Sequence, residues 1–283
     1  MPSRGYLVLA QNGLHDYVRL AYGLALSIRL TQREVNRVSL IVPKQSDVPD
    51  NYRWAFDQII EFPWGDRSGD AEWKLHNKYL YYYVSPYAET VILDADMLFP
   101  ADVSAWWARM ALQDVVATTQ VLTYRREIVE SDFYRKTFTQ NGLPNIYTGF
   151  FFFKKSALAA ELFNQIDLIM KDWKPYYESL LRKNTPDGIS ADVCYALAIK
   201  MMDVEDLVVL REPFPTFVHM KSQLQGWGDL DVTENWTKHI PVFVNDRMDV
   251  KIGHHLQVEP LHYHVKSFLT DSIIAQYEEA LGA

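Results

Sequence analysis

The chain has 283 residues, of which 48% are hydrophobic and 23% charged, and its formal net charge is −8. This composition supports a packed core and excludes a disordered chain. The acidic balance argues against broad electrostatic binding to nucleic acid. Cys194 is the single cysteine, which fits a reducing compartment, and no stretch approaches the roughly 18 apolar residues of a membrane span. We therefore expect a cytoplasmic protein without a membrane span.

The N-terminal third has a strand–helix–strand pattern. Residues 5–10 form a short apolar run, residues 17–30 have apolar positions at helical spacing after Asp16, and residues 38–42 form a second apolar run. This order predicts an α/β fold with a doubly wound, mostly parallel sheet and helices on both faces. Nucleotides bind at the carboxyl ends of such strands, so Ala10, Gln11 and Asn12 are candidate nucleotide contacts. A plain turn between strand and helix is the alternative.

Two aspartates end a buried strand in the middle of this half. Val91, Ile92 and Leu93 precede Asp94 and Asp96, and apolar residues resume immediately afterwards. Removing an isolated carboxylate from water costs several kcal/mol, so a buried pair needs compensation. A divalent cation at the carboxyl edge of the sheet would supply it. Asp94 and Asp96 are therefore predicted metal ligands, the alternative being two solvated aspartates in a turn.

A lysine pair precedes the aspartate motif. The pattern over residues 72–84 predicts a helix, and Lys74 and Lys78 would share one face of it because they are four residues apart. Lysines at this spacing usually belong to a solvated face. The helix leads directly into the strand that carries Asp94, which favours a phosphate contact by one of them.

A late segment combines histidines with a lysine. If residues 261–268 are extended, His262, His264 and Lys266 point to the same side. Imidazoles and an ammonium group suit a metal and its bound phosphates. Histidines in the core or on the surface are the alternative. An earlier run, His219 to Lys221, repeats the His-x-Lys pattern.

The middle of the chain adds two more candidates. Gly149 precedes the apolar run 150–153, which reads as a central strand, and a glycine there allows close approach of the backbone to a ligand or to a neighbouring segment. Asp192 lies near the start of a predicted helix, where the helix dipole stabilises a carboxylate. That structural role competes with a catalytic one. Residues 207–210 are predicted to form a strand.

Basic residues alternate with aromatic ones over residues 124–140. Arg125, Arg126, Arg135 and Lys136 belong to this stretch. Such a pattern is found in acceptor-binding loops, and more often in exposed amphipathic helices. Because of these four basic residues, a nucleic acid is kept as one alternative for the acceptor.

Together these motifs resemble a GT-A fold glycosyltransferase, closest to the glycogenin-like family 8. The run Leu93 to Leu98 is similar to that family's Asp-x-Asp motif, whose aspartates hold Mn²⁺ on the diphosphate of a nucleotide sugar. The resemblance implies Mn²⁺, with Mg²⁺ next, on Asp94, Asp96 and His264, with His262 as the alternative ligand. It also implies a UDP-sugar donor and retention of the anomeric configuration. The residues expected to contact the donor are Ala10, Gln11, Asn12, Lys78, Asp94, Ala95, Gly149 and Lys266.

The resemblance also has departures. Asp192 matches the aspartate of the family's Asp-Gln pair and is the predicted catalytic residue, but Val193 replaces the glutamine. Tyr147 replaces the asparagine of the family's Asn-x-Gly strand start. The late segment resembles the family's His…Lys-Pro-Trp motif without Pro-Trp. These departures keep a catalytically weak nucleotide-sugar-binding module as an alternative.

We expect one catalytic domain over residues 1–283. Its nucleotide-binding half spans residues 1–120, its sugar and acceptor half residues 121–212, and residues 213–283 form a C-terminal elaboration that completes the site. The expected activity is metal-dependent transfer of a hexose or pentose to an acceptor hydroxyl. The acceptor is left open between a carbohydrate, a protein and a modified nucleic-acid base. A nucleotidyltransferase is the alternative enzyme class, because it also places carboxylates and metal at a sheet edge.

Overall fold

The computed structural model describes residues 3–69, 71, 74–129, 135–210, 212, 214–221 and 236–283. Its strands are β1 (Arg4–Leu9), β2 (Val38–Val42), β3 (Gln58–Glu61), β4 (Glu89–Leu93), β5 (Met97–Leu98), β6 (Val115–Thr118), β7 (Tyr147–Lys154), β8 (Val218–His219), β9 (Val242–Val244), β10 (Val250–Ile252), β11 (His255–Leu256) and β12 (Leu261–His262). Its α-helices are α1 (Tyr17–Thr31), α2 (Leu80–Val84), α3 (Trp106–Met110), α4 (Lys136–Asn141), α5 (Ala157–Lys171), α6 (Trp173–Leu180), α7 (Ala191–Met201), α8 (Glu205–Val208) and α10 (Asp271–Leu281).

A six-stranded sheet of order β3-β2-β1-β4-β7-β6 forms the centre of the molecule. The first four strands are parallel, and β7 runs antiparallel to both β4 and β6. The sheet is therefore mixed and mostly parallel, as predicted. We call it the large sheet.

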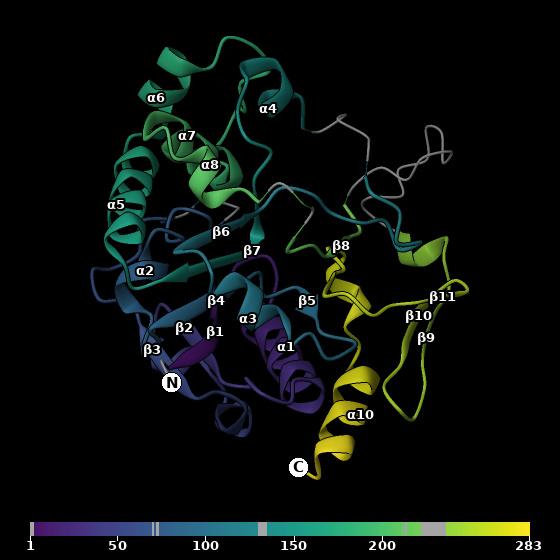
Figure 1. Cartoon of the computed structure of the whole chain (residues 1–283). Coiled ribbons are helices and arrows are strands. Elements are labelled where there is room, and N and C mark those ends of the chain that lie inside the picture. The colour runs from purple at the N-terminus through teal and green to yellow at the C-terminus, as the bar shows by residue number, and fades with distance from the viewer. Residues whose placement is uncertain are drawn as a thin grey trace.

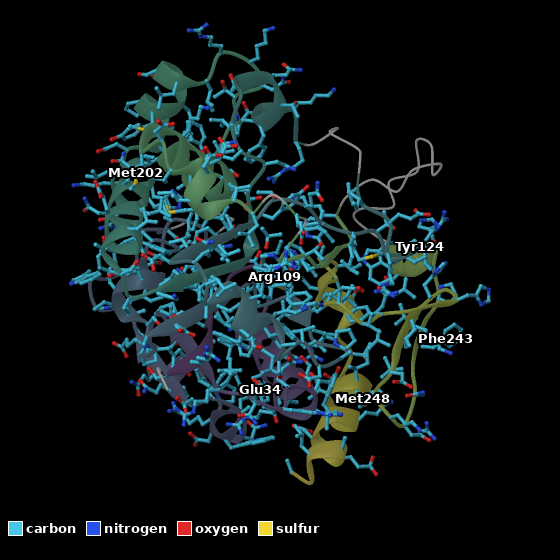
Figure 2. All side chains as sticks on the ribbon, in the orientation of Figure 1. Glu34, Arg109, Tyr124, Met202, Phe243 and Met248 are labelled. Atoms are coloured by element: carbon cyan, nitrogen blue, oxygen red, sulfur yellow. The ribbon has the colours of Figure 1, made fainter. Side chains whose placement is uncertain are left out.

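Helices cover both faces of the large sheet (Figure 1). Alternate residues of β7 show this directly, because Phe150 and Phe152 pack into the core beneath α1 and α3, while Phe151 and Phe153 pack into the core beneath α5 and α7. Successive side chains of a strand point to opposite faces, so a strand buried on both faces is apolar throughout. Figure 2 shows side chains filling the space between these layers.

A second, smaller sheet of order β5-β12-β8 lies next to the carboxyl edge of the large sheet, and we call it the small sheet. Each of its strands has two residues. The strand β12 pairs antiparallel with β5 and parallel with β8, which places His262 opposite Met97 and beside His219. A third sheet, β11-β10-β9, is a three-stranded antiparallel meander that carries the exposed Phe243 (Figure 2).

The predicted helix over residues 72–84 is wrong in most of its length. Only Leu80–Val84 is helical, residues 76–79 form turns, and Glu72 and Trp73 lie outside the described residues. The hydrogen bonds of the buried Asn77 side chain compete with helix formation here, because this side chain donates to Gln11, Asp66 and Ser68. An asparagine that bonds in this way favours a turn over a helix.

Two further predicted elements differ from the structure. Residues 205–208 form helix α8 where a strand was predicted over 207–210, because a short apolar run does not distinguish the two. The late segment is extended only over Leu261–His262. His264 then adopts a left-handed conformation with φ 59, and Lys266 begins a 3-10 helix, η5 (Lys266–Phe268).

The C-terminal helix α10 packs on α1. Arg19 Nη1 donates to the carbonyl of Leu269 at 2.8 Å, and Tyr22 donates to Glu278 at 2.6 Å. These bonds hold the late segment against the N-terminal part of the fold. Within the described residues no helix is both long and apolar enough to cross a bilayer.

Candidate active site

A cavity of about 890 Å³ opens at the carboxyl ends of β1 and β4. Sites for small ligands typically measure about 300–1,000 Å³. Ten of the predicted site residues line it: Gln11, Lys78, Asp94, Ala95, Asp96, Gly149, Asp192, His262, His264 and Lys266. Ala10 and Asn12 do not. Ala10 is fully buried, and the Asn12 side chain accepts from Val18 N at 3.0 Å and so helps to start α1.

Asp94 is paired with Lys78 across the end of β4. Lys78 Nζ lies 2.5 Å from Asp94 Oδ1, and both side chains are largely buried. Burial lowers the pKa of Lys78, but the Asp94 carboxylate more than offsets this and leaves the pKa above its usual value. The lysine therefore presents a permanent positive charge to the cavity.

Asp96 faces the small sheet and has different partners. Its Oδ2 atom lies 3.1 Å from His262 Nε2 and accepts a bond from Lys266 Nζ. Burial raises the pKa of Asp96, while His262 and Lys266 lower it more strongly, so the pKa lies well below its usual value. Asp96 is thus an ionised carboxylate with only 4% of its surface exposed.

Three side chains converge where a metal site was predicted. One ligand atom from each of Asp96, His262 and His264 lies within 4.8 Å of the others. The left-handed backbone at His264 costs a non-glycine residue about 1–2 kcal/mol, and it turns the imidazole toward the other two. Burial, with smaller contributions from His262 and Lys266, lowers the pKa of His264 to about 3. Its imidazole is therefore neutral, which is the form that binds metals.

Gly149 lies directly beneath this group. A Cβ atom added to Gly149 would stand 3.2 Å from Asp94 Oδ2 and 3.5 Å from His262 Nδ1. The distance to Asp94 is tighter than most side-chain contacts, whereas the distance to His262 is an ordinary van der Waals contact. The glycine therefore provides the close approach that the sequence predicted, and what approaches it are the two candidate site residues themselves.

Asp192 also lines the cavity, and both of its oxygens accept hydrogen bonds. Its Oδ1 atom accepts from the Thr148 backbone N–H at 2.9 Å and from the Thr148 hydroxyl at 2.7 Å. Its Oδ2 atom accepts from Arg135 Nη1 at 2.7 Å. Burial raises the pKa of Asp192, but Arg135 and Thr148 lower it by more than burial raises it, so the pKa lies below its usual value. The carboxylate is ionised and fixed in orientation.

Arg135 is the main site residue that the sequence analysis missed. The interpretation of Arg135 as an exposed basic residue is wrong, because only 4% of its surface is exposed. Its guanidinium carbon lies 3.8 Å from the ring centroid of Phe138 and 4.0 Å from that of Tyr147. At Arg135 the alternation of basic and aromatic residues marks a cation enclosed by rings, whereas Arg125 and Arg126 of the same stretch are exposed.

Two further residues line the cavity although the sequence analysis did not predict them as site residues. Tyr17, at the start of α1, lines the cavity, and its ring centroid lies 5.5 Å from Lys266 Nζ. His219 also lines it, with its ring centroid 4.9 Å from that of His262. Burial lowers the pKa of His219 well below its usual value, so this imidazole is neutral.

No protein-family model and no curated protein matches the sequence. The structure is similar to that of the glycosyltransferase GlyE of Streptococcus pneumoniae TIGR4, with a TM-score of 0.50 and 11% identity over 99% of this chain and 61% of GlyE. The chain has a glycosyltransferase fold. This finding confirms the predicted mixed α/β architecture and is consistent with the GT-A class, while membership of family 8 stays a prediction.

Two more solved structures are weaker matches. The apo form of GlyE gives a TM-score of 0.41 at 11% identity, over 75% of this chain and 46% of that one. The apo form of mouse xyloside xylosyltransferase 1 gives a TM-score of 0.48 at 11% identity, over 92% of this chain and 97% of that one. The chain thus spans about half to three fifths of the length of the GlyE chains.

Proposed function

We propose that the protein is a metal-dependent glycosyltransferase that moves a sugar from a nucleotide-diphosphate sugar, specifically a UDP-sugar, to an acceptor hydroxyl. The observation that carries the proposal is the convergence of Asp94, Asp96, Lys78, Lys266 and two histidines on one cavity. That cavity lies at the sheet edge where α/β proteins bind nucleotides. The glycosyltransferase fold supports this class of reaction.

The two lysines provide positive charge for the diphosphate. Lys78 and Lys266 each hold an aspartate at the cavity wall, so neither ammonium has to be repositioned from bulk water when a donor binds. Donors fixed before the reaction stabilise charge that develops on a leaving group better than mobile ones do. When bound, Mn²⁺ or Mg²⁺ would act as a Lewis acid on the departing diphosphate.

Asp192 would act on the sugar. An ionised carboxylate has about four lone-pair sites, and three bonds from Thr148 and Arg135 leave one of them, on Oδ2, for a ligand. This geometry suits a carboxylate that accepts a bond from one sugar hydroxyl and stabilises positive charge on the ring. Retention of configuration follows from the family resemblance and is part of the proposal.

A donor screen tests the proposal. Release of sugar from nucleotide sugars, measured with and without Mn²⁺, should be fastest for a UDP-sugar and should disappear in Asp96→Ala. Consumption of a nucleoside triphosphate with release of pyrophosphate would establish a nucleotidyltransferase instead. Metal-dependent binding of UDP-sugars without any turnover would establish a binding module.

The acceptor class is proposed only as a hydroxyl on a carbohydrate, a protein or a modified nucleic-acid base. The structure weakens the basis for a nucleic-acid acceptor, because Arg135 is buried and Arg126 donates three hydrogen bonds to Glu259, the shortest at 2.6 Å. Binding to DNA that weakens steeply with salt would restore that option. An acceptor screen with the active donor would identify the class.

A further inference from the structure

Two exposed aromatic rings contact each other on a part of the surface outside the cavity. Trp64 is 59% exposed and Tyr83 is 38% exposed, and their ring centroids lie 5.6 Å apart with the ring planes inclined at 78°. Neither residue lines the cavity. Of the largely exposed aromatic side chains in the described part of the chain, only these two contact each other: Trp54, Trp64, Tyr83 and Phe243. We call Trp64 and Tyr83 the aromatic platform.

The fold holds both rings in place. Trp64 lies in the turn after β3, next to Gly65, whose φ of 76 is a left-handed conformation that glycine adopts without strain. Tyr83 belongs to α2 and contacts Tyr82, with 5.7 Å between the ring centroids. Tyr82 in turn stacks at 5.5 Å on Phe163, which is buried in the core beneath α5. Side chains that are ordered before a ligand arrives reduce the entropy cost of binding.

An ion pair borders the aromatic platform. Arg67 Nη1 donates to Asp167 Oδ1, and the guanidinium carbon of Arg67 lies 3.7 Å from the ring centroid of Tyr79, which also contacts Tyr83. Burial, with a smaller contribution from the Asp167 carboxylate, raises the pKa of Tyr83, so its hydroxyl keeps its proton and can donate a hydrogen bond. Arg67, Asp167 and the Tyr83 hydroxyl therefore add polar groups to the rings without adding net charge.

The size and the charge of the platform limit what it can bind. Whole aromatic side chains present about 150–250 Å² each, so the exposed parts of Trp64 and Tyr83 together offer on the order of 200 Å². A stable protein interface needs about 800 Å² on each partner. Single-stranded nucleic acid needs a positively charged groove beside its stacking rings, and Asp167 neutralises Arg67. A short stretch of a neutral sugar chain meets both limits.

We propose that the aromatic platform is a carbohydrate-binding site for a neutral sugar chain, separate from the cavity. The C–H groups on one face of a sugar ring are apolar and slightly positive, and they complement the negative face of an aromatic ring. The hydroxyls at the edge of the sugar ring then meet Arg67, Asp167 and the Tyr83 hydroxyl. Because the two aromatic rings are nearly perpendicular, Trp64 and Tyr83 contact different parts of the sugar chain.

One loop connects the platform with the cavity wall. Asp66, two residues after Trp64, accepts a hydrogen bond at 2.6 Å from Gln11 Nε2, and Gln11 lines the cavity. The Asn77 side chain donates to Asp66 Oδ1 at 2.6 Å and accepts from Arg67 N at 3.0 Å. A sugar chain held at the platform is therefore kept at a fixed place near the cavity, which raises its effective concentration there. Its use as the acceptor rests on the proposed function, whereas its binding does not.

The test uses the full chain and three neutral polysaccharides, namely dextran, arabinoxylan and galactomannan. Affinity electrophoresis in gels that contain each polysaccharide detects binding, and fluorescence titration with a polysaccharide that retards the protein gives the Kd. Trp64→Ala is the informative variant, because this side chain is exposed and circular dichroism can verify that the fold is kept. Trp54→Ala is the matched control, since Trp54 is also exposed but has the Arg29 guanidinium 5.7 Å from its ring centroid.

We expect at least one of these polysaccharides to retard the parent protein. Trp64→Ala and Tyr83→Ala should each weaken this binding about tenfold or more, as truncation of an aromatic anchor does. Trp54→Ala and Asp96→Ala should bind as the parent protein does. Release of sugar from the donor should be unchanged in Trp64→Ala, because Trp64 lies outside the cavity.

The inference would be overturned if none of the three polysaccharides retarded the folded protein, or if Trp54→Ala weakened binding as much as Trp64→Ala. Loss of binding in Asp96→Ala alone would place the sugar chain in the cavity. A dimer in sedimentation that Trp64→Ala abolishes would assign the platform to a second copy, and an oligonucleotide complex lost in the same variant would assign it to nucleic acid.

The donor screen separates this inference from the proposed function. Retardation that depends on Trp64, without turnover of any nucleotide sugar, would leave the carbohydrate-binding site without a glycosyltransferase. Turnover without retardation would leave the glycosyltransferase without this second site.

Discussion

The large sheet and the small sheet contribute in opposite ways to the site. The large sheet has six strands, is buried on both faces and ends in Asp94, which is neutralised locally by Lys78. The small sheet has three two-residue strands, yet it sets Asp96 next to His262. Strands this short are not stable alone. The small sheet therefore has the fewer backbone hydrogen bonds, yet it positions Asp96 and His262 in the candidate site. It can do so because the large sheet supports it.

Breaking the small-sheet side of the site should have the largest effect on activity. Asp96→Asn removes the charge that His262 and Lys266 both contact, and it should lower sugar release by about 10³-fold or more. Steady-state hydrolysis of the preferred nucleotide sugar measures this. Asp102→Asn, an acidic position outside the cavity, is the control and should keep full activity. Equal activity in the two variants would remove Asp96 from the mechanism.

Breaking the large-sheet side should instead affect stability. Lys78→Met leaves the Asp94 carboxylate without its partner in a largely buried place, which should reduce the free energy of unfolding by about 3 kcal/mol. Urea denaturation at neutral pH provides the measurement. Lys74→Met, four residues earlier and bonded only to the Gly69 carbonyl in the described structure, should cost much less. If both variants were equally stable, the Lys78–Asp94 pair would have no structural role.

The seam between the two sheets can be tested at Gly149. A methyl group there would stand 3.2 Å from Asp94 Oδ2 and in ordinary contact, at 3.5 Å, with His262 Nδ1, so Gly149→Ala should displace the Asp94 carboxylate. Displacements of this kind cost up to about 100-fold in rate, and we expect a loss of about tenfold to 100-fold in kcat with the fold retained. Gly188→Ala, where the added methyl meets no atom within 4 Å, should behave like the parent protein.

Much of the large-sheet half of this comparison could be predicted from the sequence. The strand 91–93 and the aspartates that end it occur in one short run, and chain order with the rule for parallel strands places Asp94 and Asp96 at the nucleotide-binding edge. Lys78 could be linked to them because its helix-like segment leads into the same strand. These inferences needed only local pattern and topology.

The rest of the site could not be predicted to the same degree. The histidines were singled out, but as an extended segment, whereas a left-handed residue at His264 brings them together. Arg135 and Asp192 are 57 residues apart, and no local pattern pairs them. Asn77 was expected on a helix and instead holds a turn against Gln11. In each case a contact between distant parts of the chain overrode a local preference.

A smaller effect on kcat is expected from a change at Arg135, which lies outside both sheets and positions Asp192. Arg135→Lys keeps the charge but not the forked bonds to Asn145 and Asp192 or the stacking on Tyr147. The loss of one charged hydrogen bond should lower kcat by about tenfold. Arg126→Lys, an exposed arginine paired with Glu259, is the control. A kcat unchanged in Arg135→Lys would show that Asp192 needs no such support.

The smallest effect is expected in the reactivity of Cys194. This residue belongs to α7 and is buried in the core on one face of the large sheet. Burial, together with Asp192 and against a bond from Tyr177, raises the pKa of this thiol to about 12. Thiolate is the reactive form, so the native protein should not react with a disulfide reagent at pH 8, and unfolded protein should react fully. Asp96→Asn should leave Cys194 protected. Rapid labelling in that variant would show that damage to the small sheet spreads through the core.

The pairing of Asp96 with Lys266 also has a consequence for the order in which the site forms during biosynthesis. The two residues are separated by 170 positions, and a ribosome adds about 5–20 residues per second, so Asp96 waits on the order of ten to thirty seconds for its partner. During that interval the nascent polypeptide contains Asp96 without the lysine that compensates its charge. The candidate site therefore cannot be completed before Lys266, close to the end of the chain, has been synthesised.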